Sequence, residues 1–159
     1  MAEQPTAGSG NVDVTRLRLG FDGQVLLPDD DGYHQARRVW NAIVDRRPAV
    51  IARCASPSDV AAAVRFAAEC DLEIGVRCGG HSVLGLSVPE AGLMIDLSLL
   101  RSVRVDPDRR RAWVAGGAVL GDLDRASQPY ALATTSGNVS DTGVGGLTLG
   151  GGMGWLARQ

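Results

Sequence analysis

The segment Arg77-Cys78-Gly79-Gly80-His81-Ser82 combines backbone freedom with side chains that can do chemistry. Two consecutive glycines allow backbone N–H groups to point into one concavity without a Cβ in the way, which suits a diphosphate. Arg77 and Ser82 can add a positive charge and a hydroxyl donor, and the neutral imidazole of His81 offers a nucleophilic nitrogen at the rim. The alternative is a plain turn between a strand and a loop. Taken by itself, Gly-Gly-His favours that plain turn.

A second segment, residues 135–155, places Ser and Thr among closely spaced glycines. We expect it to open a helix at about Thr142 or Gly143. The exposed N–H groups of a helix N-terminus favour an anion. Position 148 is Thr, so the spacing is not the Gly-x-Gly-x-x-Gly of a Rossmann dinucleotide site. The segment is therefore a candidate anion-binding loop of another kind.

A membrane span and flexible low-complexity sequence are the alternatives for this second segment. Residues 142–157 carry no charge, but the stretch is too short and too rich in glycine to cross a bilayer. Large apolar side chains argue against low complexity: Leu147, Leu149, Met153 and Trp155. A membrane-associating domain is therefore the weakest functional interpretation of the chain.

Other reactive residue types have simpler interpretations. Arg109–Arg111 is flanked by aspartates and is expected at the solvated tip of a hairpin. Cys78 is a candidate reactive thiol, but no base or second thiol lies near it in sequence, so we expect a small buried side chain. The three cysteines and two histidines lack the spacing of a disulfide framework or a zinc site. No metal site is expected.

A strand–helix–strand unit is expected to position the first segment. Ala49–Arg53 is a strand candidate by its β-branched run, and Leu72–Arg77 is a second strand that leads into the glycine pair. Between them, Ser56 is an N-cap, Pro57 takes the first helical position and Asp59 completes a capping box. The helix that follows carries apolar residues at the helical period: Val60, Ala63, Val64, Ala67 and Ala68.

The rest of the chain mixes helices and strands without a repeat. Three further helices are expected: residues 12–19 with Gly20 as the stop, residues 33–44 with Trp40 and Ile43 on the core, and residues 119–126. Strands or extended pieces are expected at residues 25–27, 93–96, 103–105, 112–115 and 131–135. The third and fourth of these form a hairpin. The fold class is therefore α+β.

The composition is that of a globular chain of 159 residues, with 45% hydrophobic and 21% charged residues. A net charge of −2 provides no basic field for a nucleic acid or an anionic membrane. All 16 basic residues are arginine, which excludes a Walker-type loop and a Schiff-base lysine in this sequence and indicates a GC-rich bacterial gene. Residues 1–11 lack a secretory-signal pattern, so we expect a disordered leader and a cytoplasmic protein.

The two glycine segments, in this order and about 60 residues apart, resemble the flavin loops of a known family. Arg-x-Gly-Gly-His-Ser at 77–82 is similar to the first loop, and residues 142–158 are similar to the second, of FAD-linked oxidases with the vanillyl-alcohol-oxidase-type fold. The berberine-bridge-enzyme-like group of that family is the nearest in pattern. The strand–helix–strand unit over 48–77 also looks like the first unit of the flavin domain, and the likeness covers roughly residues 33–159.

The resemblance implies a cofactor and the residues that hold it. FAD would be carried by His81 as an 8α-histidyl adduct. Some relatives attach the flavin a second time through a cysteine, but Val139 takes that position here, so a single link is expected. The implied FAD-binding residues are Arg77, Cys78, Gly79, Gly80, His81 and Ser82 in the first segment and Gly137, Ser140, Thr142, Gly143, Gly145, Gly146, Leu149 and Gly150 in the second. No catalytic acid or base is carried over, because later parts of the family's chains supply it.

The resemblance also implies a domain plan. The fold would be a PCMH-type FAD-binding domain of two small α/β subdomains, truncated within the second. Residues 1–32 would be a leader and N-terminal extension, residues 33–159 the incomplete FAD-binding domain, and the substrate domain would be absent.

The implied function is FAD-dependent oxidation of alcohol or amine groups on a sugar or secondary metabolite, with oxygen as the re-oxidant. The partners would be FAD and a small-molecule substrate, with no nucleic acid and no membrane. The alternative is a catalytically inactive fragment or a binding module that lacks the substrate domain. The 159 residues alone are expected to be inactive and to bind FAD weakly or not at all.

Overall fold

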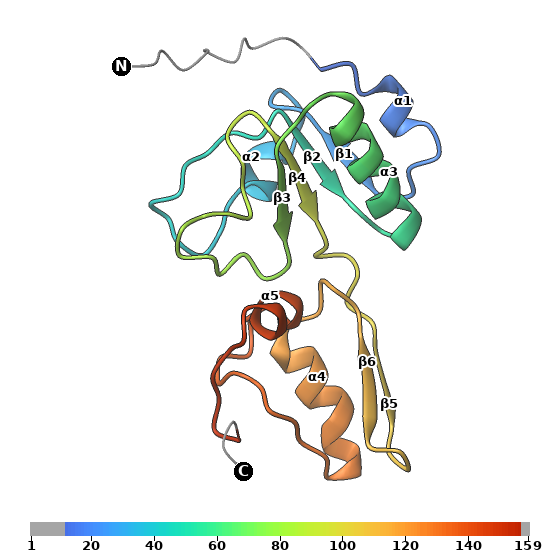
Figure 1. Ribbon diagram of the computed structural model, residues 1–159, viewed down its shortest axis with the longest axis vertical. Coiled ribbons are helices and arrows are strands. Elements are labelled where there is room, and N and C mark those ends of the chain that lie inside the picture. The colour runs from blue at the N-terminus through green and yellow to red at the C-terminus, as the bar shows by residue number, and fades with distance from the viewer. Residues whose placement is uncertain (1–11, 157–159) are drawn as a thin grey trace.

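The computed structural model describes residues 12–156, which form two lobes (Figure 1). The first lobe, residues 12–98, contains a sheet with helices on both faces, and the second, residues 99–156, contains a hairpin and helices. The disordered leader expected over residues 1–11 lies outside the described part of the chain. Among the described helices, none is long and apolar enough to cross a membrane.

The first lobe is built on a four-stranded sheet of β1 (Gln24–Leu26), β2 (Val50–Arg53), β3 (Ile74–Arg77) and β4 (Leu93–Asp96). The strand order is β1-β2-β4-β3, with β2, β4 and β3 parallel and β1 antiparallel to β2. The strand–helix–strand unit predicted from the sequence is present, but β4 is inserted between its two strands. All four residues of β4 are buried, as is typical of the central strand of a parallel sheet.

Alternate residues of the central strands face two separate apolar clusters, because successive side chains of a strand point to opposite faces. One face packs against α3 (Pro57–Glu69) and α1 (Thr15–Arg18), through Val50, Ala52, Leu93 and Ile95. The other face packs against α2 (Tyr33–Ala36) through Ile51 and Met94. The central strands β2 and β4 are thus covered on both sides, whereas Ile74 and Val76 of the edge strand β3 are exposed.

The predicted capping box starts α3. The Ser56 hydroxyl accepts the N–H of Asp59, and the Asp59 carboxylate accepts the N–H of Ser56. Ala63 and Ala67 are buried against the sheet as predicted, whereas Val64 is 44% exposed and does not belong to the buried face. Local sequence therefore sets where this helix begins, and packing selects which of its apolar residues are buried.

The helix predicted over residues 33–44 is wrong beyond its first turn. The helix α2 ends at Ala36, and the segment after it runs as an irregular loop. Trp40 and Ile43 are 66% and 90% exposed, so they do not face the core. The guanidinium of Arg37 pairs with Asp45 and also donates to a backbone carbonyl of this loop. These contacts fold the segment back on itself, and a helix cannot make them.

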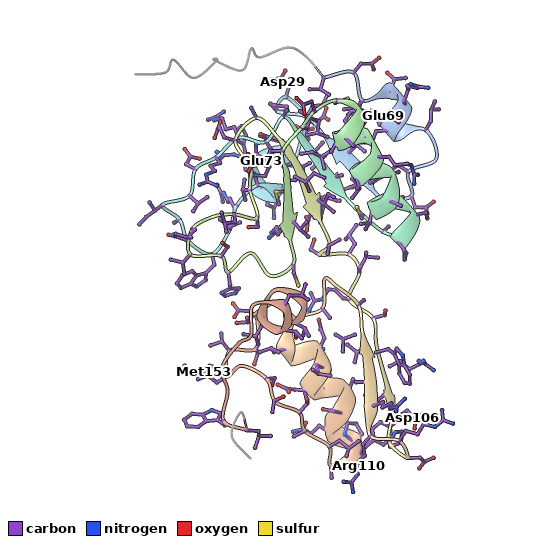
Figure 2. All side chains as sticks on the ribbon, viewed as in Figure 1. Asp29, Glu69, Glu73, Asp106, Arg110 and Met153 are labelled. Atoms are coloured by element: carbon purple, nitrogen blue, oxygen red, sulfur yellow. The ribbon has the colours of Figure 1, made fainter. Side chains whose placement is uncertain are left out.

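The second lobe contains the predicted hairpin of β5 (Val103–Asp106) and β6 (Arg111–Val114). Figure 2 shows Asp106 and Arg110 at the hairpin tip, at the end of this lobe farthest from the first lobe. The hairpin is followed by α4 (Leu120–Ser127), the 3-10 turn η1 (Gln128–Tyr130) and α5 (Val144–Leu149). Residues 131–135, expected to be extended, are irregular and form no strand.

Candidate functional site

The first glycine segment lies at the edge of the sheet that faces the second lobe. The parallel strands β2, β4 and β3 all end at this edge, and β3 continues directly into residues 78–82 (Figure 1). Gly80 has a φ of +71°, which side chains with a Cβ rarely adopt. Within the described chain, the N–H groups of the four residues 79–82 donate to no backbone carbonyl. Successive free N–H groups on a glycine-containing loop make a concavity that suits an anion.

Arg77 is held at this edge by a buried carboxylate. Asp96 is fully buried at the end of β4, and its Oδ2 lies 3.2 Å from Nη1 of Arg77 and 3.3 Å from Nε of Arg53. Two arginines on one carboxylate keep a net positive charge at the strand ends, and a buried charge requires such partners. The buried Nε–H of Arg77 has no acceptor among the described residues, and it lies beside Gly80. Arg77 therefore keeps one donor at the glycine loop.

The two glycine segments touch each other although about 60 residues separate them in sequence. A Cβ on Gly79 would lie 2.4 Å from the backbone nitrogen of Gly143. A Cβ on Gly143 would lie 2.5 Å from Sγ of Cys78. Any side chain at either position would separate the loops, so glycine is required at both for this approach. The structure thus joins the two loops that the sequence analysis selected separately.

The second segment is anchored to its own lobe around Gly143. The expected helix start is confirmed to within two residues, since α5 begins at Val144. Val144 donates its N–H to the carbonyl of Ala118 at 2.9 Å, so this donor is not free for an anion. The thiol of Cys78 donates to the same carbonyl at 3.6 Å and is half-buried between the lobes. Its position matches that of a small packing side chain.

His81 is flanked by two residues that the sequence analysis did not select. Its imidazole is stacked on the indole of Trp40, with ring centroids 5.6 Å apart and an interplanar angle of 22°. Its Nε2 lies 3.7 Å from Oδ1 of Asp141, in the loop that leads to α5. The sequence did not indicate Trp40 as a site residue, because its segment was interpreted as a helix facing the core. Asp141 lies inside the second glycine segment, and its proximity to His81 is set by the contact between the lobes.

The other predicted residues of the second segment lie at different distances from the first. Gly145 lies beside Cys78, so it belongs with Gly143 at the contact between the loops. Gly137 instead packs against leucine side chains of the second lobe. Leu149 is 91% exposed at the C-terminal end of α5, with Gly150 next to it. The structure therefore brings Gly143 and Gly145 to the first segment, but not Leu149 or Gly150.

Three further residues predicted to bind FAD accept hydrogen bonds from backbone N–H groups of this chain. The Ser82 hydroxyl accepts the N–H of Leu86 at 3.2 Å, which leaves its own O–H free to donate. The carbonyls of Ser140 and Thr142 accept N–H groups from the start of α4. Their backbone therefore holds the second segment in place, and Gly146 beyond them has no heavy atom near the position of a Cβ.

An open pocket of about 610 Å³ lies on the second lobe, between the hairpin, α4 and α5. Its lining is mainly apolar, and it includes Val105, Val114, Leu120, Leu123, Val144 and Leu147. No sequence motif indicated it, because the lining comes from separate segments. Met153 lies at the side of the same lobe, 84% exposed (Figure 2).

An acidic side chain fixes the start of α4, which in turn holds the second glycine segment. Burial raises the pKa of Asp122, but hydrogen bonds from the Val119 N–H and from Arg101 outweigh burial and hold this pKa below its ordinary value. A charged carboxylate therefore joins the helix start to the hairpin side of the lobe. Among residues 12–156, no group of three or more His, Cys, Asp or Glu could hold a metal ion.

Comparison with known proteins decides the family. A family model described as FAD binding domain matches residues 48–159. The chain belongs to the FAD binding domain family. It is 39% identical over 141 residues to (R)-6-hydroxynicotine oxidase of Paenarthrobacter nicotinovorans. The aligned region covers 89% of this chain and 31% of that enzyme. It is also 38% identical over 117 residues to berberine bridge enzyme-like 18 of Arabidopsis thaliana. That alignment covers 71% of this chain and 22% of that protein.

A solved structure of the same family is glucooligosaccharide oxidase from Acremonium strictum, which carries a 6-S-cysteinyl, 8α-N1-histidyl FAD. It matches with a TM-score of 0.77 and 33% identity, over 84% of this chain and 28% of that enzyme. The family and the α+β flavin-domain fold expected from the two glycine segments are therefore confirmed, as is the likeness to berberine-bridge-enzyme-like oxidoreductases. The chain spans about a third or less of the length of these FAD binding domain relatives.

Proposed function

We propose that the protein is an FAD-dependent oxidoreductase whose flavin is attached covalently to His81. The observation that carries the proposal is the contact of Gly79 with Gly143, beside the free N–H groups of residues 79–82 and the His81 imidazole. An anion cradle next to a nucleophile suits a diphosphate cofactor that is also bound covalently. His81 would carry the 8α-histidyl link.

The donors at the strand ends suit the negative charge of the FAD diphosphate. Arg77 has an unpaired, buried Nε–H, and the loop after it has four unpaired backbone N–H groups. The proposed FAD-binding residues near this point are Arg77, Cys78, Gly79, Gly80, His81, Ser82, Gly143 and Gly145. Contacts from Gly137, Ser140, Thr142, Gly146, Leu149 and Gly150 stay predictions, as does the division of the chain at residue 33.

FAD would supply the redox chemistry by taking two electrons from an alcohol or amine and passing them to oxygen. The described residues would bind and orient it. The backbone of residues 79–82 would bind the phosphates, and the packed glycine loops would exclude water from them. No acid or base for the substrate reaction is assigned to this part of the chain.

A single covalent link is proposed. Glucooligosaccharide oxidase carries its FAD through both a cysteine and a histidine. Val139 stands in the second glycine segment where such a cysteine is expected, and it is 51% exposed. A valine side chain has no nucleophile, so His81 alone would form the link.

The proposed substrate class is a small molecule with an oxidisable alcohol or amine group. Among the relatives, one is named for hydroxynicotine and another for a glucooligosaccharide. The second candidate function is FAD binding without catalysis, because the described residues supply anion donors at the glycine loops and are assigned no acid or base for a substrate reaction. Flavin-dependent oxygen consumption with an amine or sugar distinguishes the two.

The covalent link is tested by denaturing the protein, expressed from its complete reading frame, in acid. We expect the precipitate to keep the visible flavin absorbance in wild type and to lose it in His81→Ala. His34→Ala is the matched control, because His34 is the other histidine of the sequence and is exposed on α2. Release of all flavin from the wild-type protein would refute the covalent proposal. Tight stoichiometric binding of FAD by residues 1–159 alone would refute the expected weak binding.

A further inference from the structure

A row of charged side chains crosses the carboxyl ends of the parallel strands, on the face of the sheet that packs against α2. Asp96 ends β4, Arg53 ends β2 and Arg77 ends β3, and the strand register pairs both arginines with Asp96. Paired residues of neighbouring strands project to the same face, and Met94, two residues before Asp96, belongs to the apolar cluster of Tyr33. The three charged side chains therefore lie side by side at the edge where the first glycine segment begins.

The Asp96 carboxylate is bound through both of its oxygens. Its Oδ2 accepts hydrogen bonds from Nη1 of Arg77 at 3.2 Å and from Nε of Arg53 at 3.3 Å. Its Oδ1 accepts the backbone N–H of Ser98 at 2.9 Å. The carboxylate is fully buried, whereas the side chains of Arg77 and Arg53 are 22% and 30% exposed. The fold thus fixes the carboxylate, and two arginines on one acid leave a net positive charge at the sheet edge.

The Arg77 guanidinium lies directly against the glycine loop. Its Nε is 3.3 Å from the position that a Cβ would take on Gly80. The Nε–H is buried and has no acceptor among residues 12–156, so no described group neutralises this side of the guanidinium. Because Asp96 binds Nη1 of the same planar group, the guanidinium is held in this orientation beside the loop.

We propose that Asp96 is a positioning residue for the diphosphate of the cofactor and that it acts through Arg77. Asp96 holds the Arg77 guanidinium beside Gly80. Arg53 balances the buried carboxylate, so that the charge of Arg77 stays available to an anion on the loop. The inference rests on the proposed function, because the anion is the diphosphate of the proposed FAD. It adds a buried acid and a second arginine, neither of which the sequence analysis selected.

The positioning role of Asp96 is separable from its charge. Asp96→Asn removes a negative charge near the loop, so a purely electrostatic effect would strengthen the binding of a diphosphate. The same substitution removes the charge-assisted hydrogen bond to Arg77 and frees the guanidinium to turn away from Gly80. Positioning therefore predicts weaker binding, which is the opposite sign.

The first test compares FAD with riboflavin, which lacks the diphosphate. Both are titrated by calorimetry into protein expressed from its complete reading frame with the substitution His81→Ala, so that binding stays reversible. Asp96→Asn is expected to weaken FAD binding about tenfold, as the loss of one hydrogen bond between charged groups does, and to leave riboflavin binding unchanged. Asp108→Asn is the matched control, since Asp108 is exposed in the hairpin turn.

The second test keeps Asp96 in place. Arg77→Lys retains the positive charge, but an ammonium that pairs with Asp96 has no second nitrogen to place beside Gly80. It is expected to weaken FAD binding about tenfold and riboflavin binding not at all. Arg53→Gln is expected to weaken FAD binding less than Arg77→Gln does, although both remove one charge. Arg65→Gln is the control, because Arg65 is exposed on α3.

Circular dichroism establishes that each variant is folded, and Arg77→Lys decides the outcome if Asp96→Asn does not fold. Unchanged or tighter FAD binding in Asp96→Asn overturns the inference. So do equal losses in Arg53→Gln and Arg77→Gln, or a His81→Ala protein that binds FAD no more tightly than riboflavin. Failure of the proposed function gives a different result, namely wild-type protein that releases all its flavin in acid.

Discussion

Replacing Gly143 with alanine is expected to force the two glycine loops apart. The added Cβ would lie 2.4 Å from the backbone nitrogen of Gly79 and 2.5 Å from Sγ of Cys78. The φ of Gly143 is −67°, a value that alanine adopts readily, so the cost is steric and not conformational. The nitrogen belongs to the backbone and cannot rotate away as a side chain would.

The magnitude follows from the overlap. Ordinary contact with a Cβ starts at 3.4 Å, so the backbones at Gly79 and Gly143 must separate by about 1 Å. Overpacking of this kind costs about 1–3 kcal/mol. For a chain of 159 residues each kcal/mol lowers Tm by about 2–4 °C, so a cost of about 2 kcal/mol lowers Tm by about 4–8 °C.

Thermal unfolding followed by circular dichroism measures this change. Gly146→Ala is the matched control, because a Cβ at Gly146 meets nothing within 4 Å and the residue lies in α5, the helix that Gly143 caps. Alanine there gains up to about 1 kcal/mol of helix propensity, so Tm is expected to stay constant or rise. Equal Tm values for the two variants, or a higher Tm for Gly143→Ala, would show that the loops do not meet as described.

Three predictions concern the first lobe. Ser56→Ala removes the cap of α3 and is expected to cost about 1 kcal/mol, or about 2–4 °C in Tm, by calorimetry. Burial raises the pKa of Asp59, but four backbone N–H donors outweigh burial and hold this pKa below its ordinary value. The stabilisation by the Asp59 carboxylate is therefore complete above about pH 4 and is lost as the pH falls further. At pH values under about 4, the urea concentration at the unfolding midpoint should decrease for wild type and should change less for Asp59→Asn. The variant should also be about 1–3 kcal/mol less stable at neutral pH, and an equal acid response in both proteins would contradict this assignment. Burial raises the pKa of the Cys54 thiol to about 12, so mass spectrometry after iodoacetamide at about pH 8 should find Cys70 alkylated and Cys54 intact.

Short-range chemistry was predictable where a few neighbouring residues decide the outcome. The Ser56-Pro57-Ser58-Asp59 sequence predicted the start of α3 because both capping hydrogen bonds close within one turn. The hairpin and β4 were predicted for the same kind of reason: turn residues and a buried apolar run act locally. The first glycine segment was also selected from its residue types alone.

The segment after α2 shows where local pattern misleads. Val39, Trp40, Ile43 and Val44 have the spacing of a helical face, yet the chain there is irregular. The Asn41 side chain donates to the carbonyl of Val83 at 2.9 Å, and the Arg46 guanidinium donates to the carbonyl of Gly85 at 3.1 Å. These acceptors lie about 40 residues away in sequence. Their contribution depends on the folded arrangement, and it outweighs the local preference for a helix.

The sequence by itself determined the two glycine segments, the histidine beside one of them and the elements that deliver them. The order β1-β2-β4-β3, the contact of Gly79 with Gly143 and the neighbours of His81 were decided by the tertiary structure. The physical reason is the separation along the sequence between the groups that interact. Capping, turns and strand patterning depend on groups within a few residues, whereas the histidine's surroundings come from loops some 40 residues before it and 60 residues after it, which meet only when the two lobes pack.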